Sequence, residues 1–252
     1  MKTTTTGSTW LAADYHFPTA YSCRVPMSSM SSSRAMPAPG PATVRLALVR
    51  TGIELFGLEH TRDELFPVLR SAEIRIRPPE RVAFSMQIVR AYKGNSYRAL
   101  AQGNWEESIV CREVAHASGP MTVYLRVPTH HVRDCRLALK SVAYWGQASS
   151  LAWCVGVYPA APQNSEVAVP LRSLNVSHPI RQFFSCVVSE FRDTQVEWSE
   201  VMPVLHMGKM DAIRLEIYVW PMMIRLKHSG GTILRRCSLE GSISPTDVSS
   251  RP

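Results

Sequence analysis

The sequence contains no uninterrupted apolar stretch near the ~20 residues that a membrane-spanning helix requires. Residues 1–7 are rich in threonine and lack an apolar core, which predicts that no secretory signal peptide is present. Neither membrane-spanning nor secreted proteins are therefore the expected class. Disorder is not expected either, because hydrophobic residues make up 45% of the chain and can build a core.

The chain also lacks the short motifs of common catalytic and metal sites. It has no GxSxG, Walker loop, HExxH or dinucleotide-binding glycine fingerprint. Its six cysteines are far apart and form no CxxC pair, so they predict neither a zinc site nor a redox couple. We expect buried, reduced thiols in a cytoplasmic protein, without a metal or a cofactor.

Acidic residues and lysine are both scarce. Asp and Glu total 20 against 28 Lys and Arg, which gives a formal net charge of +8, and only 5 of the 28 are lysine. Arginine carries a planar fork of donors that binds phosphates and stacks on bases, whereas lysine is a point charge. The composition therefore favours nucleic acid as the partner, with an acidic protein surface as the second possibility.

Hydrophobic periodicity predicts an α+β fold. Residues 37–41, rich in proline, introduce a helix that Gly57 closes, with Arg45 on its outer side. Further helices are predicted over 61–69 and 132–142. Strands are predicted at 9–17, 73–77, 82–88, 109–115, 121–127, a buried 151–158, 183–191, 212–220 and 223–227. This order fits a ferredoxin-like (RRM-like) βαββαβ body over residues 8–160, followed by a β-rich region over 161–240 and a disordered tail, 241–252.

Three segments combine basic and aromatic residues in a pattern that suits RNA. The first is the irregular loop after the first strand, the second the Arg-rich region 70–98, and the third the turn after the helix at 132–142. The candidate RNA-binding residues are Tyr21, Arg24, Arg34, Arg75, Arg77, Tyr92, Lys93, Tyr97, Arg98, Gly146, Gln147 and Ser149. Solvated strand charges and an ordinary helix end, with Trp145 in the core, are the structural alternatives.

Histidine gives no pattern of its own. His130 and His131 are adjacent, so on a helix they point about 100° apart and do not form a shared metal face; we expect them at the surface of a helix end. A metal-free ribonuclease needs only an acid, a base and a cation, so the sequence leaves an RNA-cleaving enzyme open without supporting it.

The order of the N-terminal segments resembles a known family. Residues 15–26 (YHFPTAYSCRVP), then the proline-rich stop at 37–41 and a helix, are similar to the opening of the CRISPR-associated Cas-five family. Residues 108–114 and the aromatic-Gly-x-x-Ser-Ser-Leu turn within 137–159 are also similar in kind. This family is the RAMP-superfamily subunit of type I Cascade complexes.

The resemblance implies a specific organisation and role. It implies a ferredoxin-like body with a β-hairpin thumb at about 82–126 and a smaller C-terminal β region. Such subunits bind the 5′ handle of the crRNA in antiviral defence, contact the backbone and large subunits, and lie near target DNA. Most members do not cleave RNA, so a non-catalytic subunit is expected. The alternatives are a RAMP-superfamily endoribonuclease that processes repeat RNA, and a protein-interaction module.

Overall fold

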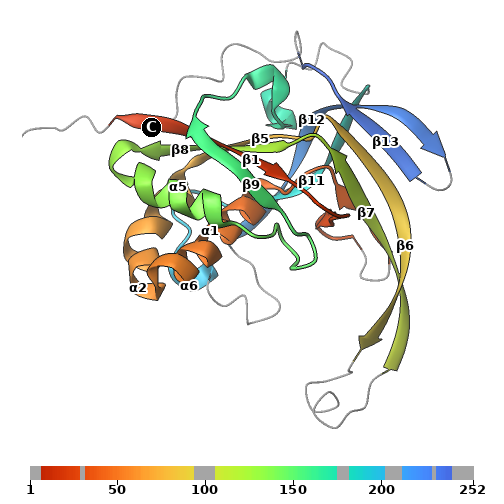
Figure 1. Ribbon diagram of the computed structural model, residues 1–252, viewed down its shortest axis with the longest axis horizontal. Helices are drawn as coiled ribbons and strands as arrows, with labels where there is room; N and C mark the ends of the chain where they lie inside the picture. The colour runs from red at the N-terminus through yellow and green to blue at the C-terminus, as the bar shows by residue number, and fades with distance from the viewer. Residues whose placement is uncertain are drawn as a thin grey trace, which may run out of the picture.

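The fold is built around two antiparallel sheets. A computed structural model describes residues 7–28, 32–93, 106–174, 182–201, 212–228 and 231–239. The first sheet has the strand order β5–β8–β1–β9 (Figure 1). Its members are β1 (Ser8–His16), β5 (Glu73–Arg77), β8 (Met121–Pro128) and β9 (Trp153–Pro159). Neighbouring strands run antiparallel throughout this sheet.

Two helical segments connect these strands and pack together on one side of the molecule (Figure 1). The first comprises α1 (Pro41–Phe56), α2 (Leu58–His60), a π-helical turn (Thr61–Leu65) and α3 (Phe66–Ser71), between β1 and β5. A 3-10 turn (Thr129–His131) and α5 (Val132–Ser141) join β8 to β9. Gly57 ends α1 at a φ of 84°, a left-handed conformation that glycine adopts without strain.

The second sheet joins a long hairpin to the C-terminal strands. Its order is β10–β12–β13–β6–β7–β3, with β11 also paired to β12. The strands are β3 (Ser32–Ser33), β6 (Arg81–Lys93), β7 (Glu106–Ser118), β10 (Val169–Pro170), β11 (Phe183–Phe191), β12 (Ile213–His228) and β13 (Gly231–Arg236). The short strands β2 (Cys23–Arg24) and β4 (Ala35–Met36) pair separately. The remaining elements are 3-10 turns at Asn164–Glu166 and Leu171–Ser173 and the helix α6 (Trp198–Val201).

The hairpin of β6 and β7 leaves the body of the protein (Figure 1). The apolar face predicted for 82–88 is therefore only half buried: Val82 and Phe84 lie in the core, whereas Met86 and Ile88 are exposed. The hairpin runs from Arg81 to Ser118, and residues 121–126, which the sequence analysis assigned to the thumb, belong to β8 of the first sheet. The hairpin thus shares one sheet with the C-terminal strands.

The main core lies between the helices and the first sheet. Leu11, Leu48, Leu69 and Leu125 are fully buried there. Removing such a side chain from water contributes about 1.5–3 kcal/mol. A smaller cluster, which includes Ala12, Tyr124 and Val219, involves β1 and β8 of the first sheet and β12 of the second. The second sheet is therefore packed against the first rather than attached as a separate unit.

Three details of the sequence prediction are corrected. Segments 212–220 and 223–227 form one strand, because Pro221 lies within an irregular part of the β11–β12 pairing, where a missing N–H is tolerated. Strand β9 is not buried, since it is the sheet edge, and Trp153 is 64% exposed. Arg45 faces inward from α1 and is buried. The predicted tail 241–252 lies outside the described residues.

All six cysteines are free thiols in the structure. Burial raises the pKa of Cys23 and Cys135 to about 12, so both are protonated and unreactive at neutral pH. In the described ranges, no helix combines the length and apolar character needed to cross a membrane.

Candidate nucleic-acid interface

Three segments that are far apart in the sequence meet at the base of the β6–β7 hairpin. The backbone of Tyr21 exchanges two hydrogen bonds with Ala115 of β7, at 2.9 and 2.8 Å. The next residue, Ser22, donates its backbone N–H to the Ser150 hydroxyl oxygen at 3.0 Å. The early loop, the hairpin and the turn at 146–150, each of which carries sequence-predicted sites, are therefore physically joined.

Arg34 lies on the solvent side of this junction. Its side chain is 74% exposed, and its guanidinium is 3.4 Å from one carboxylate oxygen of Glu113. Glu113 is buried, and its other oxygen accepts the backbone N–H of Ala35 at 2.8 Å. The carboxylate thus fixes the loop backbone, whereas its long contact with the exposed guanidinium contributes little and leaves Arg34 able to bind an anion.

Arg24 is held in a tight turn of the same loop. Its backbone pairs with that of Ala35 between β2 and β4, and Ala35 directly follows Arg34 in the chain. Its guanidinium donates to the backbone oxygen of Ser28 at 3.3 Å and to the Ser28 hydroxyl at 3.4 Å. No acidic partner of Arg24 is recorded within the described residues, so its charge is not neutralised there.

Arg112 is a basic residue of the junction that the sequence analysis did not select. It lies on β7, where its backbone is paired in parallel with Ser33, directly before Arg34. In the part of the chain that the structure describes, no carboxylate forms an ion pair with it. Arg112 falls outside the dense basic region 70–98, and no local sequence pattern places it beside the loop of Arg34, 78 residues earlier in the chain.

The turn at 146–150 has free backbone donors. Gly146 adopts a φ of 72°, and the chain closes through Trp145 N–H to Ser150 O at 3.1 Å and Ser150 N–H to Gln147 O at 2.9 Å. Within the described residues, the N–H groups of 146–149 have no recorded partner. Trp145 is buried in the core, as the structural alternative required, but this does not prevent the turn from presenting N–H groups to a phosphate.

Tyr21 is not accessible for base stacking. It is 1% exposed, its ring stacks on Phe17 with centroids 3.8 Å apart, and its hydroxyl donates to Pro37 O at 2.6 Å. Burial raises the pKa of this hydroxyl well above its ordinary value. This tyrosine anchors the loop from inside the protein, so the predicted role of Tyr21 in base stacking is wrong.

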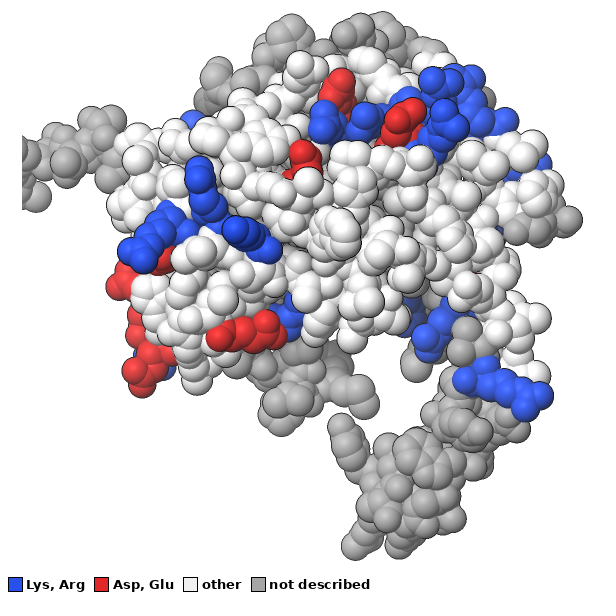
Figure 2. Space-filling model, viewed as in Figure 1, with Lys and Arg blue, Asp and Glu red and all other residues white. Residues whose placement is uncertain are grey.

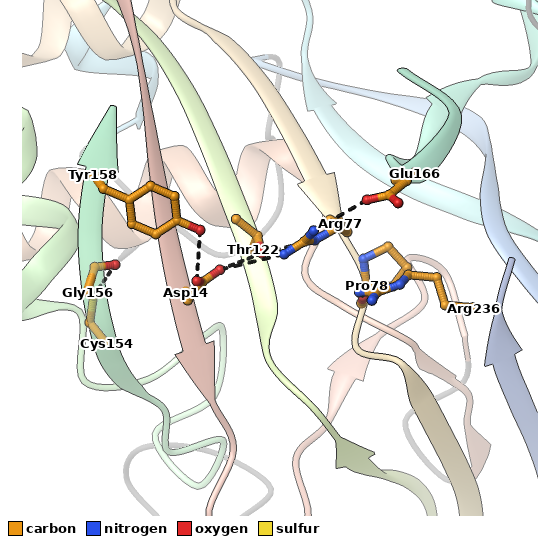
Figure 3. A network of polar contacts seen from close by, with 9 residues as sticks. All are labelled: Asp14, Arg77, Pro78, Thr122, Cys154, Gly156, Tyr158, Glu166 and Arg236. Carbon is orange, nitrogen blue, oxygen red and sulfur yellow. Dashed lines mark hydrogen bonds and ion pairs between the residues drawn. The ribbon is translucent and has the colours of Figure 1, made fainter. Parts of the chain in front are cut away.

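Arg75 and Arg77 lie in β5, away from the junction. Arg75 forms an ion pair with Glu73 at 2.8 Å. Arg77 donates to the Thr122 hydroxyl at 3.0 Å and to a Glu166 oxygen at 3.3 Å (Figure 3). Both guanidiniums therefore already have partners within the protein, and neither belongs to the junction.

The network around Arg77 crosses the first sheet to the C-terminal region (Figure 3). The Thr122 hydroxyl donates to Asp14 at 2.6 Å, and Tyr158 donates to the other Asp14 oxygen at 2.9 Å. These contacts join β1, β5, β8 and β9 to the 3-10 turn that holds Glu166. The network is structural, and no local sequence pattern indicates it, because its members are distributed over the whole chain.

The remaining candidates lie at the far end of the hairpin. The backbones of Tyr92 and Lys93 pair with Glu107 and Glu106 at the end of β6. Their side chains, and all of Tyr97 and Arg98, lie outside the described part of the structure. Figure 2 shows Lys and Arg side chains along the hairpin, over α5 and over β12–β13, with a largely uncharged surface between them.

The histidine pair lies where the sequence analysis expected, in the 3-10 turn before α5, with ring centroids 4.2 Å apart. Among the described residues no group of three His, Cys, Asp or Glu side chains could hold a metal ion. Burial lowers the pKa of His131, the charge of His130 lowers it further, and Glu64 and Asp134 oppose the shift.

We expect the Cε1–H resonance of His131 to titrate below the ordinary histidine value of about 6.5. The unfolded chain then binds this proton more readily than the folded one, so His131 makes the protein less stable as the pH falls through this range. NMR titration measures the midpoint. His130→Asn should raise it, and a midpoint at or above 6.5 in the unmodified protein contradicts the assignment.

One curated relative gives a significant match. No protein-family model matches the chain. The protein named CRISPR-associated protein Cas5, from Archaeoglobus fulgidus, is 33% identical over 84 residues, which is 33% of this chain and 37% of that protein. This match confirms the resemblance to the Cas-five family. The alignment spans little more than a third of the relative's length.

Solved structures give weaker likenesses. A CRISPR protein from Archaeoglobus fulgidus has a TM-score of 0.45 and 12% identity, covering 90% of this chain and 91% of its own. The Type III-B Cmr-beta complex bound to cognate target RNA has a chain with a TM-score of 0.44 and 9% identity, covering 60% of each chain. A CRISPR RNA-guided surveillance complex has one at 0.33 and 10%, covering 98% of this chain and 94% of its own.

Proposed function

We propose that this chain is an RNA-binding subunit of a CRISPR effector complex. In this role it binds the 5′ handle of the crRNA, contacts the backbone and large subunits of a type I Cascade, and lies near target DNA. The likeness to a Cas5 protein supports the assignment to a CRISPR complex. The antiparallel order β5–β8–β1–β9, with helices after β1 and after β8, supports a ferredoxin-like βαββαβ body.

The junction at the base of the hairpin is the observation that carries the RNA-binding proposal. The contacts Tyr21–Ala115 and Ser22–Ser150 bring the early loop, the hairpin and the 146–150 turn together. Phosphates of a single RNA strand would be bound by three arginines, Arg24, Arg34 and Arg112. The backbone N–H groups of the 146–150 turn would bind a further phosphate of the same strand. The β6–β7 hairpin would act as a thumb, and Tyr92 and Tyr97 are the remaining candidates for base stacking.

Replacing Arg24 and Arg34 together with Glu is expected to weaken binding of a handle RNA at least about tenfold, because two phosphate contacts become repulsive. Each phosphate contact to a single strand contributes ~0.7 to the slope of log K against log salt. Because two contacts are lost, this slope should become shallower by about 1.4. Fluorescence anisotropy at several salt concentrations measures both.

The control carries the same change of charge elsewhere on the surface. Arg62 and Arg192 are exposed and each is paired with the adjacent aspartate. The double variant Arg62→Glu, Arg192→Glu should bind RNA as the unmodified protein does. Equal affinity of the unmodified protein and the Arg24, Arg34 variant would reject the proposed contacts.

We further propose that the subunit does not cleave RNA. Purified protein incubated with CRISPR repeat RNA and a chelator should leave the RNA intact. His116 contacts the Ser85 hydroxyl at 3.2 Å on the hairpin, and His131 precedes α5. Defined cleavage that His116→Ala or His131→Ala abolishes would instead establish the endoribonuclease alternative.

A further inference from the structure

At the body end of β6, two arginines on neighbouring strands lie directly opposite each other. In the antiparallel pairing of β13 with β6, Arg235 lies opposite Arg81. Opposed residues of such a pair have Cβ atoms about 4.5–5.5 Å apart, and like charges at this spacing destabilise the sheet. Two cations therefore share one face of the sheet at a position where an anion between them would remove the repulsion.

These and neighbouring cations lack strong carboxylate partners. Arg225, Lys227 and Arg235 are exposed on the β12–β13 hairpin, and no ion pair is recorded for any of them within the described residues. Arg81 has one acidic neighbour, Glu80, at 3.8 Å, but both side chains are largely exposed, so this pair is weak.

This arrangement differs from that of most arginines on the body. Arg75, Arg126 and Arg172, for example, each form an ion pair with a glutamate. Figure 2 shows Lys and Arg side chains gathered over the β12–β13 end of the molecule, beside a few acidic side chains. The positive charge of this surface is thus local and largely unneutralised.

The surface is suited to a nucleic-acid backbone rather than to bases. The aromatic side chains of β12, Tyr218 and Trp220, are buried, so neither offers a stacking platform. The exposed apolar residues between the cations, Leu226 and Ile233, are aliphatic. Arginine and lysine without aromatic partners contact phosphates, which provide affinity without reading sequence.

We propose that the face defined by the opposed pair Arg81 and Arg235, with Arg225 at the adjacent register shift of β12, is a second nucleic-acid site, which binds the sugar–phosphate backbone of a strand. It is separate from the junction of Arg24, Arg34 and Arg112, and it uses different strands of the second sheet. This proposal goes beyond the proposed handle-binding function, and it rests on its own contacts.

The test compares two double variants with the same change of charge. Arg225→Glu, Arg235→Glu alters the proposed face. Arg133→Glu, Arg136→Glu alters exposed arginines of α5, for which the described residues provide no ion pair. Binding of labelled single-stranded RNA, single-stranded DNA and duplex DNA is measured by anisotropy over a series of salt concentrations, and thermal unfolding confirms that each variant is folded.

We expect the β12–β13 variant to lose about tenfold or more in affinity for at least one of these nucleic acids. Its salt dependence should become shallower by about 1.4 for a single strand. The α5 variant should bind as the unmodified protein does. The effect should persist in the Arg24→Glu, Arg34→Glu background, because the two sites do not share contacts.

Other outcomes overturn the proposal. Unchanged affinity of the folded β12–β13 variant in all three arms rejects the second site, even where the Arg24, Arg34 variant shows that the junction binds RNA. Equal losses in the α5 variant would indicate a non-specific effect of net charge and also reject it. Labelled polyglutamate is measured in the same way as a model of an acidic protein. If the β12–β13 variant loses affinity for polyglutamate but keeps its nucleic-acid affinity, the face belongs to an acidic protein partner and the nucleic-acid site is rejected.

Discussion

Replacing Arg45 with Ala is expected to lower the free energy of unfolding by about 3–5 kcal/mol, since it leaves a largely buried carboxylate, that of Glu190, without its partner. Arg45 lies inside α1, where its guanidinium forms an ion pair with Glu190 of β11. It also donates to Leu69 O at 3.0 Å and to Ala72 O at 2.8 Å. One side chain thus connects α1, the end of α3 and the second sheet. Chemical denaturation measures the loss.

A variant that also changes Glu190 is the control for Arg45→Ala. Glu190 also accepts the backbone N–H of Phe191 at 2.8 Å and is contacted by the Tyr218 hydroxyl at 3.4 Å. The double variant Arg45→Met, Glu190→Gln removes both charges and should be less destabilised than Arg45→Ala alone. Arg62→Ala, which breaks an exposed pair, should leave stability unchanged. A loss for Arg45→Ala no larger than for Arg62→Ala would show that the buried pair does not stabilise the fold.

The elements that local pattern determines were predictable from the sequence. Alternation of Ile and Arg gives β5 its bounds, Glu73–Arg77, with Ile74 and Ile76 buried. The predicted strand 183–191 is β11. Helix α1 starts at the proline-rich segment and stops at Gly57, as expected from the fixed φ of proline and the freedom of glycine. These features depend on residues within a few positions of one another.

Features that depend on distant pairing were not predictable in the same way. No local pattern indicates that β13 pairs with β6, which places the C-terminal strands beside the hairpin. The period-2 pattern places Arg75 and Arg77 on one face of the strand. It does not indicate which carboxylates lie next to that face. For the same reason Arg45 was expected on the outer side of α1, although Glu190, which makes its burial favourable, is 145 residues away.

The candidate site shows the same division. The early loop and the 146–150 turn were selected because arginine, glycine and serine occur there in suitable combinations. Their contact with each other, through Ser22 and Ser150, depends on the fold. The loop position of Tyr21 suggested stacking, but its hydroxyl bonds to Pro37 and its ring lies in the core. Composition selected the segments, whereas burial decides which of their side chains are available.

Replacing Trp145 with Ala is expected to cost about 3–5 kcal/mol, because it removes a large side chain that is fully buried. The indole packs edge-to-face on Tyr15, with ring centroids 4.9 Å apart, and Tyr15 in turn donates to Leu139 O of α5. Trp145 directly precedes the turn whose Ser150 contacts the early loop. Denaturation measures the stability, and anisotropy at a temperature where the variant is folded measures RNA binding.

Trp145→Phe separates packing from hydrogen bonding. In the described structure the indole Nε1 of Trp145 is buried without a hydrogen-bond partner, so its removal relieves the cost of an unsatisfied donor. We therefore expect Phe to retain most of the stability that Ala loses. If the turn binds RNA, the Phe variant should keep normal affinity, and the Ala variant should lose affinity because the backbone N–H groups of 146–149 are no longer fixed. Equal stability losses for Phe and Ala would contradict the expectation that ring packing carries the stability, and unchanged RNA affinity in the Ala variant would remove the turn from the interface.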